Sequence, residues 1–256
     1  MREALRARRA VYGLFAALPS PSLVEMVGAA GYDFAILDAE HALVDAQTLQ
    51  HMIRAAEAFG IAPLVRVPER DTGMILRVLD AGAHGVVVPH VRRPQDVEDA
   101  VAAARYAPEG MRSLGSGRNV GYGRNELREY VTAANARTLV VPMIEDAEAV
   151  ERIDEIVAVP GTDMVLEGAA DLSQSLGVTW QTRHPDVLAA VSKVAAACTR
   201  AGVPFCAIPR VPSDHAAWYA AGVRAFVLGE ERGVAARALR AHLAAHRDNG
   251  SEVDRA

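Results

Sequence analysis

Short apolar runs alternate along the chain with longer segments in which apolar residues recur at helical spacing. We expect strands at residues 11–16, 34–39, 63–67, 85–89, 139–144, 164–166, 204–208 and 225–228. We expect helices at residues 22–30, 46–59, 72–81, 94–105, 147–157, 185–201, 213–221 and 231–245. The strand segments are almost wholly apolar, which is typical of parallel strands that helices cover from outside. The pattern therefore predicts an α/β protein.

The eight β/α units follow one another without a long linker. A (β/α)8 barrel typically takes about 250 residues, and the chain has 256. A doubly wound open sheet is the alternative, but it usually carries a phosphate loop, and neither a GxGxxG motif after the first strand nor a Walker lysine motif is present. We predict a single-domain (β/α)8 TIM barrel over residues 1–246, followed by a flexible tail over residues 247–256.

Composition narrows the classes of partner. Lys and Arg number 27 against 32 Asp and Glu, and the net charge of −5 argues against nucleic acid or an anionic membrane as the main partner. No run of about 18 apolar residues is present, so no membrane span is predicted. Two cysteines, Cys198 and Cys206, are too few for a disulfide framework and fit no zinc pattern. We therefore expect a reducing, cytoplasmic location.

One connection breaks the regular spacing of the elements. Residues 106–123, between the fourth and fifth strands, form a long glycine-rich segment that carries Arg112 and Arg118. Long connections of this kind are more often functional than structural. We interpret this segment as an active-site loop.

Polar residues stand where several of the predicted strands end. Asp38 ends the second strand and is followed by His41, Arg66 ends the third strand, Glu145 follows the fifth, and Asp171 comes shortly after the sixth. Active sites of such barrels lie at the C-terminal ends of the strands. His90, at the end of the fourth strand, is a weaker candidate. The pattern predicts that these side chains share one site.

The residue types in this set indicate a particular chemistry. Glu145 and Asp171 offer two carboxylates to one hard cation, the arrangement that Mg²⁺ or Mn²⁺ uses. His41 beside Asp38 is a candidate base whose ring a carboxylate orients. Arg66 offers a planar fork for a substrate carboxylate. Together they predict the binding and enolisation of a 2-oxo acid on a metal ion.

Simpler interpretations exist for each residue taken alone. A strand-end acid is often only the cap of the next helix, and Asp171 is a natural cap for the residues that follow it. His41 alone would more often be structural or exposed, and Arg66 alone would more often form an ion pair. The set as a whole favours the functional interpretation.

Six blocks of sequence carry a resemblance to a known family. They are Leu-Asp-Ala-Glu-His at 37–41, Val-Arg-Val-Pro at 65–68, Leu-Asp-Ala-Gly-Ala at 79–83, Tyr-Ala-Pro-Glu-Gly-Met-Arg at 106–112, Ile-Glu at 144–145 and Ala-Asp-Leu-Ser-Gln-Ser-Leu-Gly at 170–177. In order and spacing they resemble the HpcH/HpaI aldolase/citrate lyase family, over roughly residues 11–243. The first and last blocks are the most specific.

The resemblance implies an activity and an assembly. Typical members cleave 4-hydroxy-2-oxo acids to pyruvate and an aldehyde through a metal-bound enolate and without a Schiff base. No lysine stands at a strand end here, which agrees with metal chemistry. The resemblance also implies a homo-oligomer, namely a hexamer in which the last helix is often exchanged between subunits.

The resemblance also assigns roles to residues. It implies that Glu145 and Asp171 hold a divalent metal, which is Mg²⁺, Mn²⁺ or Co²⁺, and that Arg66 holds the oxo-acid carboxylate. His41, paired with Asp38, matches the catalytic acid/base. Two further residues match family positions: Ala170 in substrate binding, and Asp80 near the site of a neighbouring subunit. For Asp80, a solvated helix-end acid is the alternative.

Two departures from the family pattern bear on the substrate. Met143 stands where pyruvate aldolases of this group carry a glutamine, and Glu167 adds a carboxylate where they have an apolar residue. The blocks at 110–118 and 166–173 look closer to an offshoot of the fold, a citrate synthase of siderophore biosynthesis that condenses acetyl-CoA with oxaloacetate. Arg112 and Arg118 would then hold the second carboxylate of oxaloacetate, or else only attach the loop to carbonyl groups.

Three functions stay open from the sequence. The first is a class II, metal-dependent aldolase or lyase, which is the reaction of most family members. The second is citrate synthase-type condensation, with His41 as base and oxaloacetate as electrophile. The third is a non-catalytic barrel that binds a ligand, which would predict a broken metal pair, whereas Glu145 and Asp171 are both present.

Overall fold

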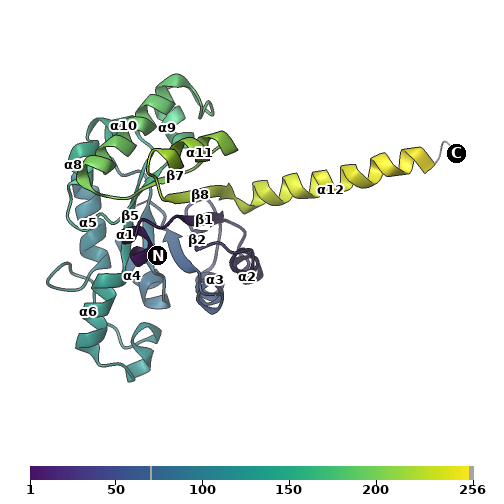
Figure 1. The fold of residues 1–256 in the computed structure, drawn as a ribbon. Helices are drawn as coiled ribbons and strands as arrows, with labels where there is room; N and C mark the ends of the chain where they lie inside the picture. The colour runs from purple at the N-terminus through teal and green to yellow at the C-terminus, as the bar shows by residue number, and fades with distance from the viewer. Residues whose placement is uncertain (70, 254–256) are drawn as a thin grey trace.

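The computed structural model describes residues 1–69 and 71–253, with side chains of the last helix as far as residue 247. Its eight parallel strands close into a barrel in the order β1 to β8 (Figure 1). The strands are β1 (Val11–Ala16), β2 (Phe34–Asp38), β3 (Ala62–Arg66), β4 (Gly85–Val88), β5 (Leu139–Ile144), β6 (Val165–Glu167), β7 (Phe205–Ala207) and β8 (Ala225–Glu230). The predicted (β/α)8 TIM barrel of one domain is confirmed.

Helices cover the outside of the barrel. They are α1 (Arg2–Arg6), α2 (Pro21–Ala29), α3 (Ala46–Ala58), α4 (Thr72–Ala81), α5 (Pro94–Ala104), the 3₁₀ helix η1 (Arg118–Gly123), α6 (Leu127–Arg137), α7 (Ala147–Glu151), α8 (Ile153–Val157), α9 (Ala169–Ser175), α10 (Pro185–Ala201), α11 (Pro212–Ala220) and α12 (Glu231–Val253). Side-chain caps start several of them: Ser20, Asp45 and Asp71 accept hydrogen bonds from the first-turn N–H groups of α2, α3 and α4.

The helices differ from the sequence-based expectation in three ways. The predicted helix at 147–157 is two short helices, α7 and α8, that meet at Arg152. Four elements, α1, η1, α6 and α9, were not predicted. The predicted last helix ended at residue 245, but α12 continues to Val253 and extends away from the barrel in Figure 1. It thus runs through much of the range expected as a tail, of which residues 254–256 lie outside the described residues.

Alternation along each strand divides the core into two layers. Phe34, Ile36 and Leu64 point into the barrel and belong to its inner core, whereas Leu37 and Val65 pack against the helices. Side chains along a strand alternate between the two faces of the barrel wall. The face on which the residue at a strand end lies therefore follows from its position relative to these core residues. The alternation therefore decides which charged residues face the barrel axis.

The same alternation of side chains distinguishes two glutamates at neighbouring strand ends. On β5, Val141 and Met143 belong to the inner core, so Glu145 continues the inner row. On β6, Leu166 belongs to the inner core, so Glu167 falls on the outer row. Two acids that look alike in the sequence therefore take opposite faces of the barrel wall.

Candidate active site

A cavity of about 500 Å³ opens at the C-terminal ends of the strands. Seven of the eight strands, or the loops directly after them, contribute to its wall. The lining residues include Phe15, Asp38, His41, Arg66, Met143, Gly168, Ala170, Asp171, Ile208, Arg210 and Glu230. The cavity therefore brings together Asp38, His41, Arg66, Ala170 and Asp171, as the sequence predicted.

Asp38 and Arg66 form a buried ion pair at the floor of this cavity. They stand opposite each other in the pairing of β2 with β3, and they are 4% and 7% exposed. Arg66 donates from Nε to Asp38 Oδ1 at 3.0 Å and from Nη2 to Oδ2 at 2.8 Å. The guanidinium also lies over the Phe15 ring, 4.8 Å from its centroid. Aligned neighbours on two strands thus fix the plane of the arginine fork.

The pKa of Asp38 follows from this environment. Burial alone would raise it, but the hydrogen bonds and charge of Arg66, together with the backbone N–H groups of Glu40 and His41, outweigh burial and lower the pKa. The pKa of Arg66 is raised despite burial, because the carboxylates of Asp38, Glu40 and Glu145 favour its charged form. The pair is ionised over the whole physiological pH range.

The predicted orientation of the His41 ring by Asp38 is wrong. The carboxylate of Asp38 accepts the backbone N–H of His41 at 3.3 Å, but its side-chain contacts are taken by Arg66. The imidazole Nε2 lies 3.8 Å from Glu40 Oε2 instead, and the His41 side chain is 57% exposed. The bidentate arginine contact is stronger and lies deeper in the barrel, so it outcompetes the imidazole for the carboxylate. His41 therefore lines the cavity as an unrestrained ring.

Glu145 is the most buried acid of the site, with 1% exposure. Its Oε1 accepts the backbone N–H of His90 at 2.8 Å, whereas its Oε2 has no hydrogen-bond partner among the described residues. Burial raises the pKa of Glu145 to about 7, and the negative charges of Glu40 and Asp171 add to the rise, against the opposing effect of His90. An unpartnered carboxylate oxygen beside other acids favours a cation at this point.

The backbone at Gly168 makes room for this arrangement. A Cβ atom on residue 168 would lie 2.6 Å from Glu145 Oε2 and 2.5 Å from its Cβ. Only glycine allows α9 to begin so close to the end of β5. Asp171 lies in the first turn of α9 and does not cap it, since no side-chain cap is formed there. The alternative interpretation of Asp171 as a helix cap is therefore wrong.

The two carboxylates fit a divalent metal ion. Members of this kind of barrel that use a hard cation need oxygen ligands and retained waters, and Glu145 Oε2 and Asp171 supply the former. No cluster of three or more metal-binding side chains was found in residues 1–69 and 71–253. A metal here would therefore depend on two carboxylates, with water or substrate completing the coordination.

Three predicted site residues lie elsewhere. Asp80, near the end of α4, receives Arg112 Nη2 at 2.7 Å. Arg118 donates to the carbonyl of Ala81 at 3.0 Å and pairs with Glu57. These contacts attach the segment 106–123 to the C-terminal ends of α3 and α4, at the opposite end of the barrel. The interpretation of this segment as an active-site loop of its own chain is wrong, because it follows helix α5 and such connections lie at the N-terminal ends of the strands.

Met143 and Glu167, the two departures from the family pattern, lie in different parts of the barrel. Met143 lines the cavity, and its Sδ lies 4.0 Å from Arg66 Nη1. Glu167 is buried outside the cavity, where it accepts the backbone N–H of Ile208, and burial raises its pKa to about 7. Met143 therefore changes the polarity of the pocket, whereas Glu167 joins the end of β6 to the residue after β7.

Sequence reasoning missed one residue that shapes the site, Glu40, and gave a second, His90, too little weight. Glu40 Oε2 lies 3.1 Å from Arg66 Nη1, and its Oε1 lies 3.6 Å from His90 Nε2. His90, only a weak candidate from sequence, adopts a left-handed backbone with φ of 49°, while its N–H is bonded to Glu145. The signal for Glu40 was its position two residues after Asp38, inside the most specific block of sequence.

A closed barrel that carries a buried arginine and paired carboxylates at the C-terminal ends of its strands is the arrangement of a barrel enzyme. A profile of the HpcH/HpaI aldolase/citrate lyase family matches residues 11–237. The chain belongs to this family, and the aldolase or lyase class predicted from the sequence is confirmed. Enzymes of this class form or cleave carbon–carbon bonds, and the family is metal-dependent.

Individual relatives fall into two groups. The 5-keto-4-deoxy-D-glucarate aldolase of Shigella dysenteriae serotype 1 (strain Sd197) is 32% identical over 236 residues, which are 91% of this chain and 91% of the aldolase. The structure of the citrate synthase SbnG is 43% identical, covers 98% of both chains and has a TM-score of 0.92. The HpcH/HpaI aldolase from Desulfitobacterium hafniense DCB-2 is 30% identical, with 95% of both chains covered and a TM-score of 0.89.

Proposed function

We propose that this enzyme catalyses the reversible aldol cleavage of a 4-hydroxy-2-oxo acid to pyruvate and an aldehyde. The observation that carries the proposal is the buried Glu145 Oε2, which lacks a hydrogen-bond partner and lies beside Gly168 and Asp171 at the cavity. The likeness to the 5-keto-4-deoxy-D-glucarate aldolase over nine-tenths of both chains supports the same reaction class.

Glu145 and Asp171 would hold the divalent ion, which we propose to be Mg²⁺, with Mn²⁺ and Co²⁺ as the other candidates. Carboxylate oxygens suit the first two ions best. When bound, the ion supplies positive charge beside the 2-oxo group and so stabilises the negative charge that develops there as the carbon–carbon bond breaks.

Arg66 binds the carboxylate of the 2-oxo acid. Its Nε and Nη2 are engaged with Asp38, and Nη1 lies 3.1 Å from Glu40 Oε2. Nη1 also faces the thioether of Met143 at 4.0 Å, a weak acceptor that a carboxylate oxygen readily replaces. Asp38 acts through Arg66, because it holds the guanidinium plane at two points. This orientation decides which end of the substrate reaches the carboxylates.

His41 exchanges the proton of the reacting hydroxyl group. Its ring is exposed at the cavity and unrestrained by Asp38, and an imidazole is the side chain best suited to gain and lose a proton near neutral pH. Glu40 Oε2 lies 3.8 Å from its Nε2. Ala170 contributes to the wall that the substrate contacts.

A second candidate is the condensation of acetyl-CoA with oxaloacetate to citrate, as in siderophore biosynthesis. The observation that favours it is the 43% identity with the citrate synthase SbnG over 98% of both chains, which exceeds the 32% identity with the aldolase. The apolar Met143 beside Arg66 agrees with it. In this reaction His41 would take the proton from the acetyl methyl group, and Arg66 would hold oxaloacetate.

One experiment separates the two reactions. The purified enzyme is incubated with Mg²⁺, acetyl-CoA and oxaloacetate while free thiol is followed and the product is identified by mass. In parallel it is incubated with a 4-hydroxy-2-oxo acid while pyruvate is followed. Pyruvate without thiol release supports the aldolase. Thiol release together with citrate supports the second candidate and contradicts the first.

The control variants are Glu145→Gln and Glu148→Gln. Glu148 is exposed on α7, three residues further along the chain, so its change leaves the site intact. If Glu145→Gln binds Mg²⁺ as well as the wild type does, both enzymatic proposals fail and a non-catalytic ligand-binding barrel remains. We also propose a cytoplasmic homo-hexamer, which light scattering of the purified protein tests for its oligomeric part. No helix in the described part of the chain is long and apolar enough to cross a membrane.

A further inference from the structure

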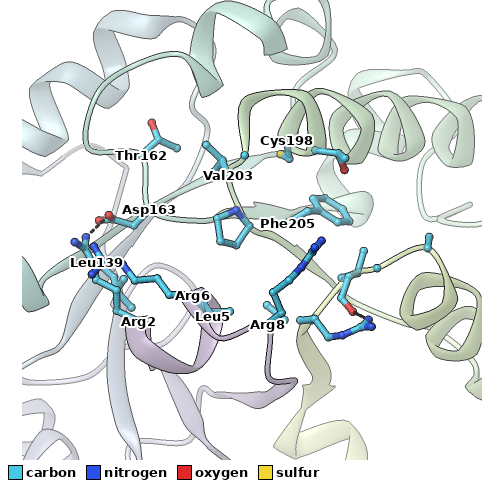
Figure 2. A pocket seen from close by; sticks show the side chains of 18 residues that line it. Arg2, Leu5, Arg6, Arg8, Leu139, Thr162, Asp163, Cys198, Val203 and Phe205 are labelled. Atoms are coloured by element: carbon cyan, nitrogen blue, oxygen red, sulfur yellow. Dashed lines mark hydrogen bonds and ion pairs between the residues drawn. The ribbon is translucent and has the colours of Figure 1, made fainter.

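A second hollow of about 510 Å³ lies at the other end of the barrel, where the strands begin. Its wall comes from α1 and the residues after it, from the start of β5 and from the segments that lead into β6, β7 and β8. Figure 2 shows this hollow, with Arg2, Arg6 and Arg8 on the N-terminal segment and Val203 and Phe205 across from them. It shares no lining residue with the cavity of the proposed active site.

The lining of this hollow is strongly cationic. Four arginines, Arg2, Arg6, Arg8 and Arg224, face one carboxylate, that of Asp163. The whole chain is acidic, with a net charge of −5. Four arginines around one carboxylate create a positive local electrostatic potential, which attracts anions although the chain as a whole is acidic.

The single carboxylate is already neutralised. Asp163 pairs with Arg2, as the dashed line in Figure 2 indicates, and receives Arg105 Nη2 from its other side at 2.7 Å. Burial lowers the pKa of Arg2, and the charges of Arg105 and Arg6 lower it further, against the raising effect of Asp163. The hollow therefore keeps an excess of positive charge after its internal pairing.

Two of the arginines have no partner among the residues that the structure describes. Arg224 donates from Nη1 to the carbonyls of Tyr219 and Val223, so its role is to close α11. By contrast, no hydrogen bond or ion pair within the described residues involves the guanidinium of Arg6 or of Arg8. These two groups can bind an anion without breaking an existing contact.

The backbone at Arg8 is unusual in a way that points to the same conclusion. Arg8 follows the end of α1 with φ of 53°, the left-handed conformation that favours glycine after a helix. An arginine at this position carries a cost in backbone strain that glycine would avoid. Arg8 is also one of the two arginines of the hollow without a partner among the described residues. The strained backbone therefore places an unpaired cation at the rim.

The floor of the hollow is apolar. Leu5, Leu139 and Phe205 are buried there, beside Val203 and Pro204. The carbonyls at the end of α10, which would repel an anion, are capped by the N–H groups of Gly202 and Val203. A cationic rim over an apolar floor suits an organic molecule that carries negative groups on an apolar body.

We propose that this hollow is a binding site for a small organic polyanion, one that presents two or more carboxylate or phosphate groups to Arg6 and Arg8. Bidentate contacts from arginine to either group are strong and directional. A molecule bound here would connect α1 to the segments before β6, β7 and β8, and it would stabilise the folded chain by mass action.

Calorimetric titration of the full chain tests the proposal, with citrate and pyrophosphate as separate probes and no metal ion present. The wild type is expected to bind at least one probe, and the preferred probe shows whether carboxylate or phosphate groups are recognised. The double variant Arg6→Ala/Arg8→Ala should bind about tenfold more weakly or worse. The matched control Arg9→Ala, an exposed arginine outside the hollow, should stay within about twofold.

Two further variants keep the result interpretable. Arg66→Gln disables the proposed active site, and its affinity for the probe should equal that of the wild type, which locates the binding away from that site. Arg8→Gly should bind at least about threefold more weakly without a lower melting temperature, because glycine suits the left-handed backbone. Absence of binding to both probes, or equal affinity in the wild type and the double variant, would overturn the proposal. So would loss of binding in Arg66→Gln alone.

Discussion

The two ends of the barrel use charged residues in opposite ways. At the C-terminal ends of the strands, Glu145 keeps one buried oxygen without a partner and Arg66 keeps a donor facing a thioether. At the N-terminal ends, the charge of Arg105 is paired with Asp163 and its Nη atoms donate to the carbonyls of Asn135 and Thr138, although its buried Nε has no partner among the described residues. The carboxylate of Glu145 is left incomplete, whereas at the other end the charge of Arg105 is matched by Asp163 and only part of the cationic lining, Arg6 and Arg8, has no partner among the described residues.

This difference shows how to separate function from structure in a barrel. Charges that satisfy one another hold loops and helix ends in place and have nothing left for a ligand. Charges that stay unsatisfied although buried cost stability and persist where a ligand supplies what is missing. By this criterion Asp80 and Arg118 are structural within one chain, since each has its partner, and the charge of Arg112 is matched by Asp80 although its buried Nε has no partner among the described residues.

The largest effect is expected for Glu145→Gln. The amide removes the negative charge that a divalent ion needs and so should lower kcat/KM by about a thousandfold, as measured with the substrate that the assays above identify. Mg²⁺ affinity, from calorimetry, should fall with it. The exposed control Glu148→Gln should keep full activity. If Glu145→Gln retains activity, the unpartnered carboxylate is not needed for the reaction. The functional contrast between the two ends of the barrel would then be wrong.

The next effect belongs to the other end of the barrel. Arg105→Ala leaves the partly buried Asp163 with Arg2 and the N–H of Val140, and it removes the side-chain donor to the Asn135 carbonyl and one of two donors to the Thr138 carbonyl. The free energy of unfolding should therefore fall by about 3 kcal/mol. Urea unfolding measures this loss. The kcat of the folded fraction should not change. A specific loss of kcat, with stability intact, would show that this network serves the reaction. Arg152→Ala, at an exposed pair, is the control.

Arg66 and Arg118 should differ sharply in activity. Arg66→Ala removes the proposed carboxylate clamp and should lower kcat/KM by about a hundredfold, mainly through KM if the residue only binds substrate. Arg118→Ala should stay within about threefold, because its guanidinium is held by Ala81 and Glu57. Comparable losses would contradict the assignment of Arg66 and would indicate that segment 106–123 contacts an active site, as the proposed hexamer would allow between subunits.

The smallest expected effect is on the pH dependence of stability. Burial raises the pKa of Glu145 from 4.5 to about 7. Between these values the folded metal-free protein keeps a proton that the unfolded chain has lost. The free energy of unfolding should therefore fall as pH rises through this range, by about 2 kcal/mol. Denaturant unfolding at pH 5 and pH 8 measures it.

Two comparisons isolate the contribution of Glu145 to that slope. Glu167, whose pKa is also raised to about 7, acts in the same direction, so the wild type is compared with Glu145→Gln, which should show a shallower slope. Saturating Mg²⁺ should reverse the trend, because the ion binds the ionised carboxylate and so favours high pH. An identical slope in the wild type and the variant would contradict the raised pKa.

Much of the fold could be predicted because it depends on local sequence patterns. Apolar runs located all eight strands within about two residues, a usual margin for element ends, and glycines and caps located most helices. The four missed elements are short or weakly amphipathic: α1 has five residues and α9 seven, and α6 lies in the irregular segment after α5. Their stability comes from packing, which periodicity does not record.

The site was partly readable for the same reason. Strand-end positions identified Asp38, Arg66, Glu145 and Asp171. Segment 106–123 was wrongly expected at the active site of its own chain, although its position along the sequence indicated otherwise. It follows a helix, and in a barrel such a connection lies at the end of the strands away from the active site.

The sequence alone determined the barrel, the family and the row of polar residues that ends its strands, because all of these depend on periodicity and on short conserved-looking blocks. Only the tertiary structure decided how those residues pair. Asp38 binds Arg66 and not His41 because the register of β2 with β3 places them side by side on the inner row. The groups without a partner among the described residues, Glu145 Oε2 beside Gly168 and Arg6 and Arg8 at the far end, are decided in the same way. Whether a charge has a partner depends on segments that are distant in the chain and adjacent only after the barrel closes.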